Sequence, residues 1–333
     1  MNGKRVLVTG GTGFVGRHLL PLLLATGARV TCLARLSAQN TRAASLPDGV
    51  AVVRTALESG EGLEKALGGQ DVVIHMAALL FGLGWQDYLR ANAGAAQALA
   101  GAVKRLEAKG EGAPSRVVLV SSLAATGPCA CSPGVTDKTP PRPVSAYGWS
   151  KLLVERILGE ALGPRLVTLR PPIIYGSGDR GLLPVFRAAA KGFGVSPGLF
   201  REFPVSVVHA RDACRAILCC CGEKANGVYH VNDGTERAMS EFNRAMGAPL
   251  GRKVRVLRLP LPVLAATAGI STVFGRFFGR VPSWNLDKYR EAKHAGWLCD
   301  ASRLGDELGY APSVGLEQGM AEAVDGYRRE RLL

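Results

Sequence analysis

A tyrosine and a lysine four positions apart, preceded by a pair of serines, are the side chains best suited to chemistry in this sequence. Tyr147 and Lys151 lie in the run Tyr-Gly-Trp-Ser-Lys, and Ser121 and Ser122 come earlier in the chain. On a helix, residues four apart project from one face. A phenol, with a pKa of about 10, exchanges protons poorly at neutral pH until a cation such as Lys151 favours its phenolate. A serine hydroxyl can stabilise the oxygen that changes charge, so the pattern predicts proton transfer at a substrate oxygen.

The N-terminal segment predicts a phosphate-binding turn between a strand and a helix. Residues 5–9 are expected to form a buried strand and residues 18–25 a helix with one apolar face. Between them lie three glycines spaced three apart, Gly10, Gly13 and Gly16. Glycine allows a tight turn and close approach of a pyrophosphate to free N–H groups at the start of the helix.

The residue after the next expected strand bears on the choice of dinucleotide. That strand covers residues 29–34 and ends at Arg35, about twenty residues past the glycine turn, where dinucleotide sites usually carry an acid for the adenosine ribose. An arginine suits a 2′-phosphate, so the sequence favours NADP over NAD. Ser37 and Arg42 can add to that contact. The alternative is a solvated arginine at the end of a strand.

Two further apolar segments are expected to deliver small and polar residues to the reactive edge of a parallel sheet. Residues 71–78 predict a buried strand ending in Ala77 and Ala78, and residues 116–120 predict a strand followed by the two serines. A helix is expected over residues 92–104. His75 lies alone on a buried strand, with no second histidine at metal spacing, so we expect a hydrogen-bonded core residue.

Together these motifs resemble the extended short-chain dehydrogenase/reductases, the group that holds nucleotide-sugar epimerases, dihydroflavonol reductases and 3β-hydroxysteroid dehydrogenases. The resemblance spans nearly the whole chain. Besides the glycine turn, Ser122 and the Tyr147/Lys151 pair, its motifs are His75-Met76-Ala77-Ala78, Asn92, Arg170-Pro171-Pro172-Ile173-Ile174-Tyr175-Gly176, Val208-His209-Ala210-Arg211-Asp212 and Leu308-Gly309-Tyr310-Ala311-Pro312.

The resemblance implies a set of site residues. Ser122, Tyr147 and Lys151 would be catalytic, Asn92 would hold a relay water, and Ser121 is the reserve candidate for the serine role. It implies that helices beginning near Asn92 and Tyr147 form a homodimer bundle. The residues expected to contact the cofactor are Gly10, Thr12, Gly13, Phe14, Val15, Gly16, Arg35, Leu57, Ala77, Ala78, Ser121, Tyr147, Lys151, Pro171, Ile173 and Ile174.

Two departures from the family pattern affect the expected ligands. Arg54-Thr55-Ala56-Leu57 stands where the family commonly places an aspartate that contacts adenine. Residues 193–200 replace the basic patch and glycine pair that sugar-nucleotide epimerases tend to carry. This segment is similar to the reductase and hydroxysteroid-dehydrogenase branches, whose substrates are more apolar. Leu80, Phe81 and Trp85 predict an apolar pocket wall, or else a flexible surface loop, and Cys129 is a further pocket candidate.

Length and composition fit an α/β protein with a Rossmann-type doubly wound parallel sheet and a smaller, mostly C-terminal substrate lobe. The chain has 333 residues, of which 47% are hydrophobic. We place the dinucleotide-binding domain at residues 1–171, with return strands near 205–208 and 228–231, and the lobe at 172–204 and 232–333. A first strand so near Met1 favours a cytoplasmic protein. The eight cysteines lack zinc-like spacing, and Cys219-Cys220-Cys221 falls in an expected helix, so we expect core packing and no metal.

The formal charge of +14 is spread along the chain, which argues against a nucleic-acid-binding module but helps attract NADP. One stretch is unusual: from Phe242 to Leu286 there are seven Lys or Arg residues and no Asp or Glu. It encloses an uncharged run from Leu259 to Gly275. We expect residues 259–280 to cover the pocket or join the core. Peripheral contact with a membrane is the second hypothesis, and a membrane-spanning helix is the least favoured hypothesis.

The leading hypothesis is therefore an NADP-dependent oxidoreductase that interconverts a secondary alcohol and a ketone on an apolar small molecule. The same residues would serve a nucleotide-sugar epimerase or dehydratase with tightly bound NAD(P). Dehydration needs an extra acid and base near Ser122, and Leu123-Ala124 supplies neither. A noncatalytic NADP-binding sensor or assembly subunit is the alternative from another class.

Overall fold

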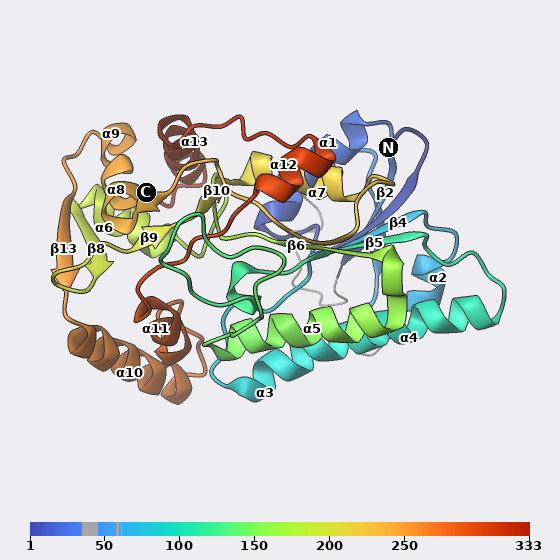
Figure 1. The fold of residues 1–333 in the computed structure, drawn as a ribbon, viewed down its shortest axis with the longest axis horizontal. Helices are drawn as coiled ribbons and strands as arrows, with labels where there is room; N and C mark the ends of the chain where they lie inside the picture. Colours follow the sequence, from blue (N-terminus) through green and yellow to red (C-terminus); the bar gives the residue numbers. More distant parts are fainter. Residues whose placement is uncertain (35–45, 58–59, 61) are drawn as a thin grey trace.

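A seven-stranded parallel sheet forms the centre of the molecule (Figure 1). The computed structural model describes residues 1–34, 46–57, 60 and 62–333. The strand order is β11-β6-β5-β4-β1-β2-β3, and every neighbouring pair is parallel. This order confirms the Rossmann-type fold expected from the sequence. The strands are β1 (Arg5–Thr9), β2 (Arg29–Ala34), β3 (Ala51–Arg54), β4 (Val72–His75), β5 (Arg116–Val120), β6 (Leu166–Arg170) and β11 (Gly227–His230).

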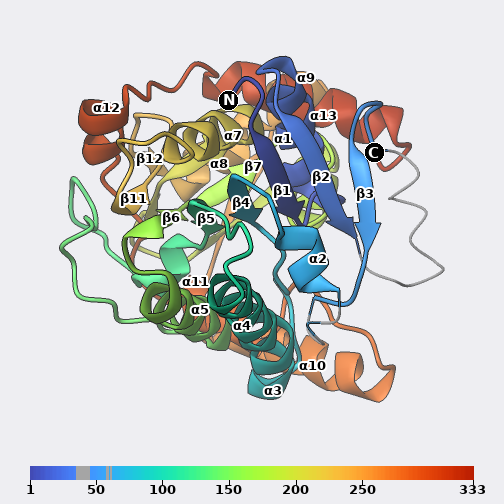
Figure 2. The ribbon, with the colours of Figure 1, turned by 90° about the vertical axis from the view of Figure 1, so that its right-hand side faces the viewer.

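Helices cover both faces of this sheet, as Figure 2 shows. One face carries α1 (Phe14–Ala25), α7 (Ala210–Cys220) and α12 (Ser302–Leu308), whose apolar side chains pack on the strands in one core cluster. The other face carries α2 (Leu63–Leu67), α4 (Gly94–Ala108) and α5 (Ala146–Leu162), which form a second cluster. Parallel strands that are buried on both faces do not need alternating polar and apolar residues, and the central residues of β1, β4 and β5 are accordingly all apolar.

A smaller lobe lies at one end of the sheet, on the left in Figure 1. Its own core contains Phe186, Phe242, Met320 and Tyr327. Its elements are α6 (Leu183–Ala190), β8 (Phe193–Pro197), α8 (Met239–Ala245), α9 (Gly247–Leu250), β13 (Arg255–Leu259), α10 (Leu261–Phe277), α11 (Leu286–Ala292) and α13 (Leu316–Arg329). Short strands connect it to the sheet: β7 (Ile173–Tyr175), β9 (Pro204–Val205), β10 (Val207–His209) and β12 (Arg237–Ala238).

Some expected element boundaries differ from those observed. The first helix begins at Phe14, not His18, because the chain turns into the helix directly at Gly13 without a capping side chain. Strand β4 ends at His75, before the two alanines, because Thr9 Oγ1 accepts a hydrogen bond from the N–H of Ala77 and redirects the chain. The expected strand at 228–231 is confirmed as β11. The one near 205–208 divides into β9 and β10, and β10 pairs with β7 instead of joining the sheet.

Asp212 has a structural role that explains one of the sequence motifs. It is buried on α7 and accepts hydrogen bonds from the backbone N–H groups of Ser313 and Val314 and from the Ser313 hydroxyl. Burial acts to raise the pKa of Asp212, but these donors and Arg215 outweigh it and leave the pKa below its ordinary value. The carboxylate thus holds the chain that follows α12 against α7.

Asp212→Asn is expected to lower the free energy of unfolding at neutral pH by about 2 kcal/mol, because an amide replaces a charged acceptor of several hydrogen bonds. A group with a depressed folded-state pKa stabilises above its unfolded pKa and loses that contribution as pH falls. The deficit should therefore shrink in acid. Urea unfolding across a pH series measures it, with the exposed Asp325→Asn as the control. An Asp212→Asn deficit independent of pH would contradict this account.

Candidate active site

The glycine turn between β1 and α1 has the shape of a phosphate cradle. Gly10 has φ +77°, and a Cβ on it would lie 2.7 Å from the backbone nitrogen of Ala77, just beyond the end of β4. A Cβ on Gly16 would overlap the carbonyl of Gly11. The first turn of α1 has no side-chain cap, so its N–H groups are free to meet an anion. The turn lies where the strand order reverses between β1 and β4, the position at which such sheets bind dinucleotides.

His75 is a core residue, as expected. Its Nδ1 lies 2.7 Å from Thr9 Oγ1, and burial lowers its pKa to about 3. The histidine is therefore neutral at physiological pH. Together with Thr9 it fixes the ends of β1 and β4 beside the glycine turn.

Ser122, Tyr147 and Lys151 come together at the carboxyl edge of the sheet. Ser122 follows β5 and caps a short 3-10 helix, η3 (Leu123–Ala125), by accepting from the N–H of Ala124 at 3.2 Å. Tyr147 and Lys151 lie one turn apart on α5 and are 7% and 3% exposed. Lys151 Nζ donates to the carbonyl of Val120, the last residue of β5, at 2.8 Å. This contact brings α5 against the strand that carries the serines.

The electrostatics of the two catalytic candidates differ. Burial raises the pKa of Tyr147, whereas the ammonium of Lys288 and hydrogen bonding with Ser122 act to lower it. Burial lowers the pKa of Lys151 to about 8, against the opposing effect of Glu155. A lysine with a depressed pKa is uncommon in folded proteins and is found preferentially at functional sites.

The two serines have separate environments. Ser121 donates its hydroxyl to Glu155, which also forms a buried ion pair with Arg170 at 2.6 Å. Ser122 instead interacts with Tyr147. The hydroxyl of Ser121 is therefore committed to the core beneath α5, and Ser122 is the serine that faces the tyrosine. Sequence reasoning missed Glu155, although its place four residues after Lys151 puts it on the same helix face.

Asn92 organises the loop that precedes α3 (Trp85–Tyr88). It lies in a π-helical turn, η2 (Leu89–Ala93), between α3 and α4. Its Oδ1 accepts from the N–H of Leu79 at 2.7 Å, and its Nδ2 donates to the Leu79 carbonyl and to Ser150 Oγ. Asn92 thus holds the start of the loop 79–85 against α5. A water-relay role stays a prediction.

The short helix α11 supplies charged residues that sequence reasoning did not assign to the site. The Asp287 carboxylate accepts from the N–H groups of Ala146 and Tyr147 at 2.7 and 3.1 Å, at the start of α5. Lys288 Nζ lies 4.6 Å from the centre of the Tyr147 ring and 2.9 Å from Glu291 Oε2. Glu291 in turn accepts from the hydroxyl of Ser145, the N-cap residue of α5.

Charge on α11 therefore bears directly on the tyrosine. Burial acts to lower the pKa of Lys288, but Glu291 and Tyr147 outweigh it, so the lysine is cationic at neutral pH. Lys288 lies about 140 residues after Tyr147 in the chain. The sequence around it indicates only that a short helix begins there, because Asn285 caps the helix by accepting from the Lys288 N–H. No local pattern connects that helix to Tyr147.

The expected pocket residues have different surroundings. The Phe81 ring centre lies 5.6 Å from the Lys288 ammonium, which also faces Tyr147, whereas Leu80 and Trp85 are 52% and 41% exposed. Cys129 is half-buried and packs with Leu123 beside the indole of Trp297. Trp297, which sequence reasoning did not single out, also packs against the group that contains Tyr147 and Tyr88. Phe81 and Trp297 thus bring apolar surface next to the charged residues of α11.

The other cofactor candidates lie in three groups. Thr12, Phe14 and Val15 belong to the glycine turn and the start of α1, and Leu57 is buried after β3. The Pro171 carbonyl accepts from the N–H of Leu123, next to Ser122, and leads into β7 with the half-buried Ile173 and Ile174. Arg35, Ser37 and Arg42 lie outside the described residues.

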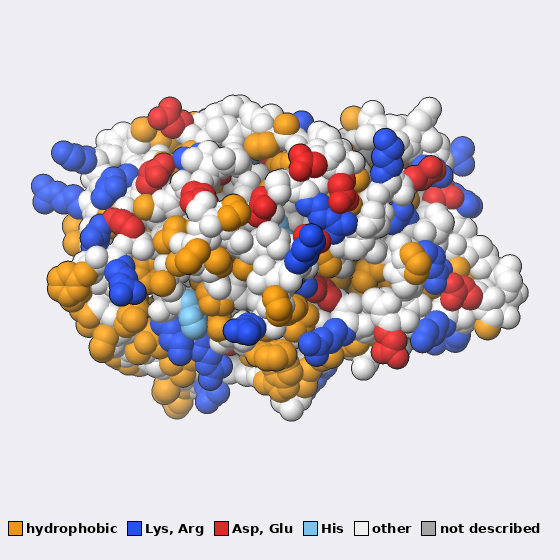
Figure 3. Space-filling model, viewed as in Figure 1, with side chains coloured by type: hydrophobic (Ala, Val, Ile, Leu, Met, Phe, Trp, Pro, Cys, Tyr) orange, Lys and Arg blue, Asp and Glu red, His pale blue; other side chains and the backbone are white. Residues whose placement is uncertain are grey.

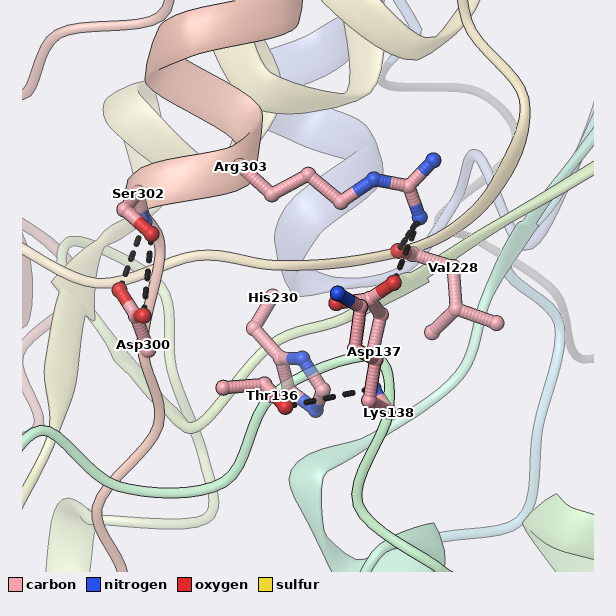
Figure 4. A pocket seen from close by; sticks show the side chains of 8 residues that line it. All are labelled: Thr136, Asp137, Lys138, Val228, His230, Asp300, Ser302 and Arg303. Atoms are coloured by element: carbon pink, nitrogen blue, oxygen red, sulfur yellow. Dashed lines mark hydrogen bonds and ion pairs between the residues drawn. The ribbon is translucent and has the colours of Figure 1, made fainter.

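A hollow of about 140 Å³ lies elsewhere, between α12 and the edge strand β11 (Figure 4). Arg303 crosses it to Asp137 at 3.2 Å and to the Val228 carbonyl at 2.8 Å. His230, at its floor, lies 3.2 Å from Thr126 Oγ1, and burial lowers its pKa to about 3. These contacts join the loop around Asp137 to the sheet edge, and none of the catalytic candidates lines this hollow.

The chain is similar to redox enzymes and epimerases of known function. A family model described as "NAD dependent epimerase/dehydratase family" matches residues 6–232. A ceramide reductase of Caulobacter vibrioides is 29% identical, with 97% of this chain and 94% of the relative covered. A 4-hydroxy-2-methyl-3-oxo-4-farnesyl-3,4-dihydroquinoline-1-oxide ketoreductase of Stigmatella aurantiaca is also 29% identical, over 95% and 94% of the two chains. The structure of a Thermus thermophilus UDP-glucose 4-epimerase in complex with NAD superposes with a TM-score of 0.75 at 24% identity, over 97% and 99% of the two chains.

Proposed function

The chain belongs to the NAD-dependent epimerase/dehydratase family, and from this premise we propose that it is an NADP-dependent oxidoreductase that interconverts a secondary alcohol and a ketone on an apolar small molecule. The observation that carries the proposal is the meeting of Ser122, Tyr147 and Lys151 at the sheet edge that also holds the glycine turn. The ceramide reductase and the quinoline-oxide ketoreductase support a carbonyl reaction on a lipid-like or prenylated compound.

The residues present fit a dinucleotide. The cradle at Gly10 leaves room that a Cβ would fill, and the uncapped start of α1 offers N–H groups to a pyrophosphate. Gly10 to Gly16 would hold the phosphates, and Pro171 to Ile174 would line the nicotinamide. A bound nicotinamide cofactor supplies or accepts the hydride. NADP is preferred over NAD on the sequence argument from Arg35.

The protein's own residues then handle the substrate oxygen and its proton. In the reductive direction the Ser122 hydroxyl donates to the carbonyl oxygen, and the Tyr147 phenol gives that oxygen a proton as negative charge develops there. In the oxidative direction the Tyr147 phenolate takes the proton from the alcohol. Lys288, at 4.6 Å from the ring, favours that phenolate, and we assign to Lys151, one turn along α5 from the tyrosine, the same effect.

The surroundings favour an apolar substrate over a sugar nucleotide. Leu79 and Trp297 pack against the cluster that contains Tyr147, and Phe81 faces the Lys288 ammonium that also faces the tyrosine. Burying such side chains against an apolar substrate is favourable by roughly 25 cal/mol for each Å² of apolar surface. The epimerase alternative keeps support from the epimerase structures that share the fold.

The test is a titration of cofactor-stripped protein with NADPH and NADH, followed by nicotinamide fluorescence. We expect tighter binding of NADPH, and oxidation of bound NADPH on addition of long-chain or cyclic apolar ketones. UDP-glucose is the comparison substrate. Cofactor that stays bound while only the sugar reacts, without net oxidation, would replace the proposal with the epimerase. Binding of neither dinucleotide would overturn both.

A further inference from the structure

One face of α10 is apolar, exposed and without a partner among the described residues. Its large side chains recur at positions 263, 270, 273, 274 and 277, a spacing that places them along one side of a helix. The opposite side, with Leu264, Ala268 and Thr272, is buried against the protein. The exposed fractions are 45% for Val263, 60% for Ile270, 65% for Val273, 59% for Phe274, 83% for Phe277 and 62% for the adjoining Phe278. We call this set the α10 face.

The α10 face lies at the outer edge of the molecule. The helix runs along the lower left in Figure 1 and projects away from the sheet in Figure 2. The three phenylalanines at its end contact one another, with Phe277 and Phe278 ring centres 5.1 Å apart and Phe274 and Phe278 ring centres 6.1 Å apart. Contiguous exposed apolar surface of this kind marks an interaction site.

The chain segment that contains α10 carries charged residues of one sign only. Phe242 to Leu286 holds seven Lys or Arg residues and no acidic residue, and Arg276 and Arg280 flank the phenylalanines. Figure 3 shows apolar and basic side chains side by side at the lower left of the molecule, the region occupied by α10. An isologous contact with a second copy would bring these cations together, which is unfavourable. An anionic surface complements them.

We propose that the α10 face docks on the surface of an anionic lipid bilayer, with α10 lying in the interface plane. A helix with an apolar face, adjacent cations and no acidic residue has the composition of an interfacial helix. Among the described helices, none is long and apolar enough to cross a membrane. Docking therefore requires only burial of the phenylalanines at the boundary between headgroups and acyl chains, while Arg276 and Arg280 meet lipid phosphates.

The docking surface is structurally joined to the candidate active site. Thr272 of α10 accepts a hydrogen bond from the N–H of Leu286 at the start of α11, the helix that places Lys288 beside Tyr147. Arg276 donates to the carbonyl of Leu83 in the loop 79–85. If the proposed function is correct, docking would hold the apolar loop and the tyrosine near the bilayer, where a membrane-dissolved carbonyl or alcohol resides. This extension to substrate class rests on the proposed function.

The experiment is flotation of the purified full chain with vesicles of phosphatidylcholine containing about one-third phosphatidylglycerol, compared with vesicles of phosphatidylcholine alone. We expect binding to the anionic vesicles that weakens as salt is raised. The double variant F274S/F277S should bind at least about tenfold less, because it removes two apolar side chains that the interface buries. R276E/R280E should lose the anionic preference. Val52→Ser, an exposed apolar position on β3, and Arg328→Glu on α13 are the matched controls and should bind like the unaltered protein.

Each outcome is decisive. Absence of flotation with either vesicle overturns the proposal, as does equal binding by F274S/F277S and the control. Self-association that F274S/F277S abolishes, without vesicle binding, would identify a second copy as the occupant instead. Vesicle binding by a protein that oxidises no NADPH with any ketone would leave docking standing and sink the proposed function. Turnover of a water-soluble ketone should be the same in F274S/F277S and the unaltered protein, which shows that the variant is folded.

Discussion

Replacing Tyr147 by phenylalanine is expected to lower the turnover of an apolar ketone with NADPH by about 10³-fold, while the affinity for NADPH stays nearly unchanged. The substitution removes one hydroxyl and retains the ring that packs against Tyr88, so the site keeps its shape. Loss of a positioned acid or base costs typically 10²- to 10⁴-fold. Single-turnover oxidation of bound NADPH measures the chemical step, and fluorescence titration measures cofactor binding separately.

Tyr88→Phe is the matched control for this substitution. Its ring lies 6.1 Å from that of Tyr147, and its hydroxyl accepts a hydrogen bond from the N–H of Gly82 at 3.0 Å. Removing that acceptor should cost about 1 kcal/mol of stability and change turnover less than tenfold. Comparable losses in the two variants would indicate a general disturbance of the loop 79–85. Tyr147→Phe protein with more than about a tenth of the original activity would remove the tyrosine from the proposed chemistry.

Replacing Lys288 by methionine is expected to slow alcohol oxidation at neutral pH by about 30-fold, with a much smaller effect on ketone reduction. The ammonium acts to lower the pKa of Tyr147, so its removal raises that pKa. An opposite charge at 4–6 Å typically shifts a pKa by about one to three units. Below the tyrosine pKa the phenolate fraction falls tenfold per unit, so the pH profile of oxidation should move to higher pH by one to two units. Reduction uses the protonated phenol, whose abundance at neutral pH hardly changes.

Two control variants separate this electrostatic role from a structural one. Lys288→Arg keeps the cation and should retain most of the oxidation rate with an unshifted pH profile. Lys293→Met, at an exposed position that follows the same helix, should leave both directions unchanged. A uniform loss in both directions with an unmoved pH profile would mean that Lys288 only supports α11 through Glu291.

The sequence predicted the sheet edge well because its signals are local. The strands at residues 5–9, 29–34 and 116–120 were predicted with the boundaries that the structure shows, since each is a short apolar run ended by glycine or polar residues. The four-residue spacing of Tyr147 and Lys151 specified a shared helix face, which α5 provides. The start of α1 was placed too late because Phe14 to Arg17 carry no capping signal.

Contacts between segments that are distant in the sequence could not be predicted. Nothing near Ser121 distinguishes it from Ser122; the distinction arises because Glu155 and Arg170 form a buried pair under only one of them. In the same way, nothing in the sequence distinguishes Lys288 from the other basic residues. Its position beside Tyr147 arises only because α11 packs against α5. The exposure of α10 is also a tertiary property, because its composition suits a pocket cover as well as a surface helix. Only the packing of Leu264 and Ala268 inward shows which side remains outside.

The contribution of α11 has a consequence for how the protein is made. The glycine turn, Ser122, Tyr147 and Lys151, on which the proposed function rests, all lie in the first half of the chain and are translated early. Asp287, which accepts from the first N–H groups of α5, and Lys288, which faces the tyrosine, follow roughly 140 residues later. A ribosome-bound intermediate can therefore hold the recognisable motifs while the tyrosine still lacks its neighbouring charge. Residues 285–293 must therefore be synthesised and folded against α5 before the surroundings of Tyr147 are complete.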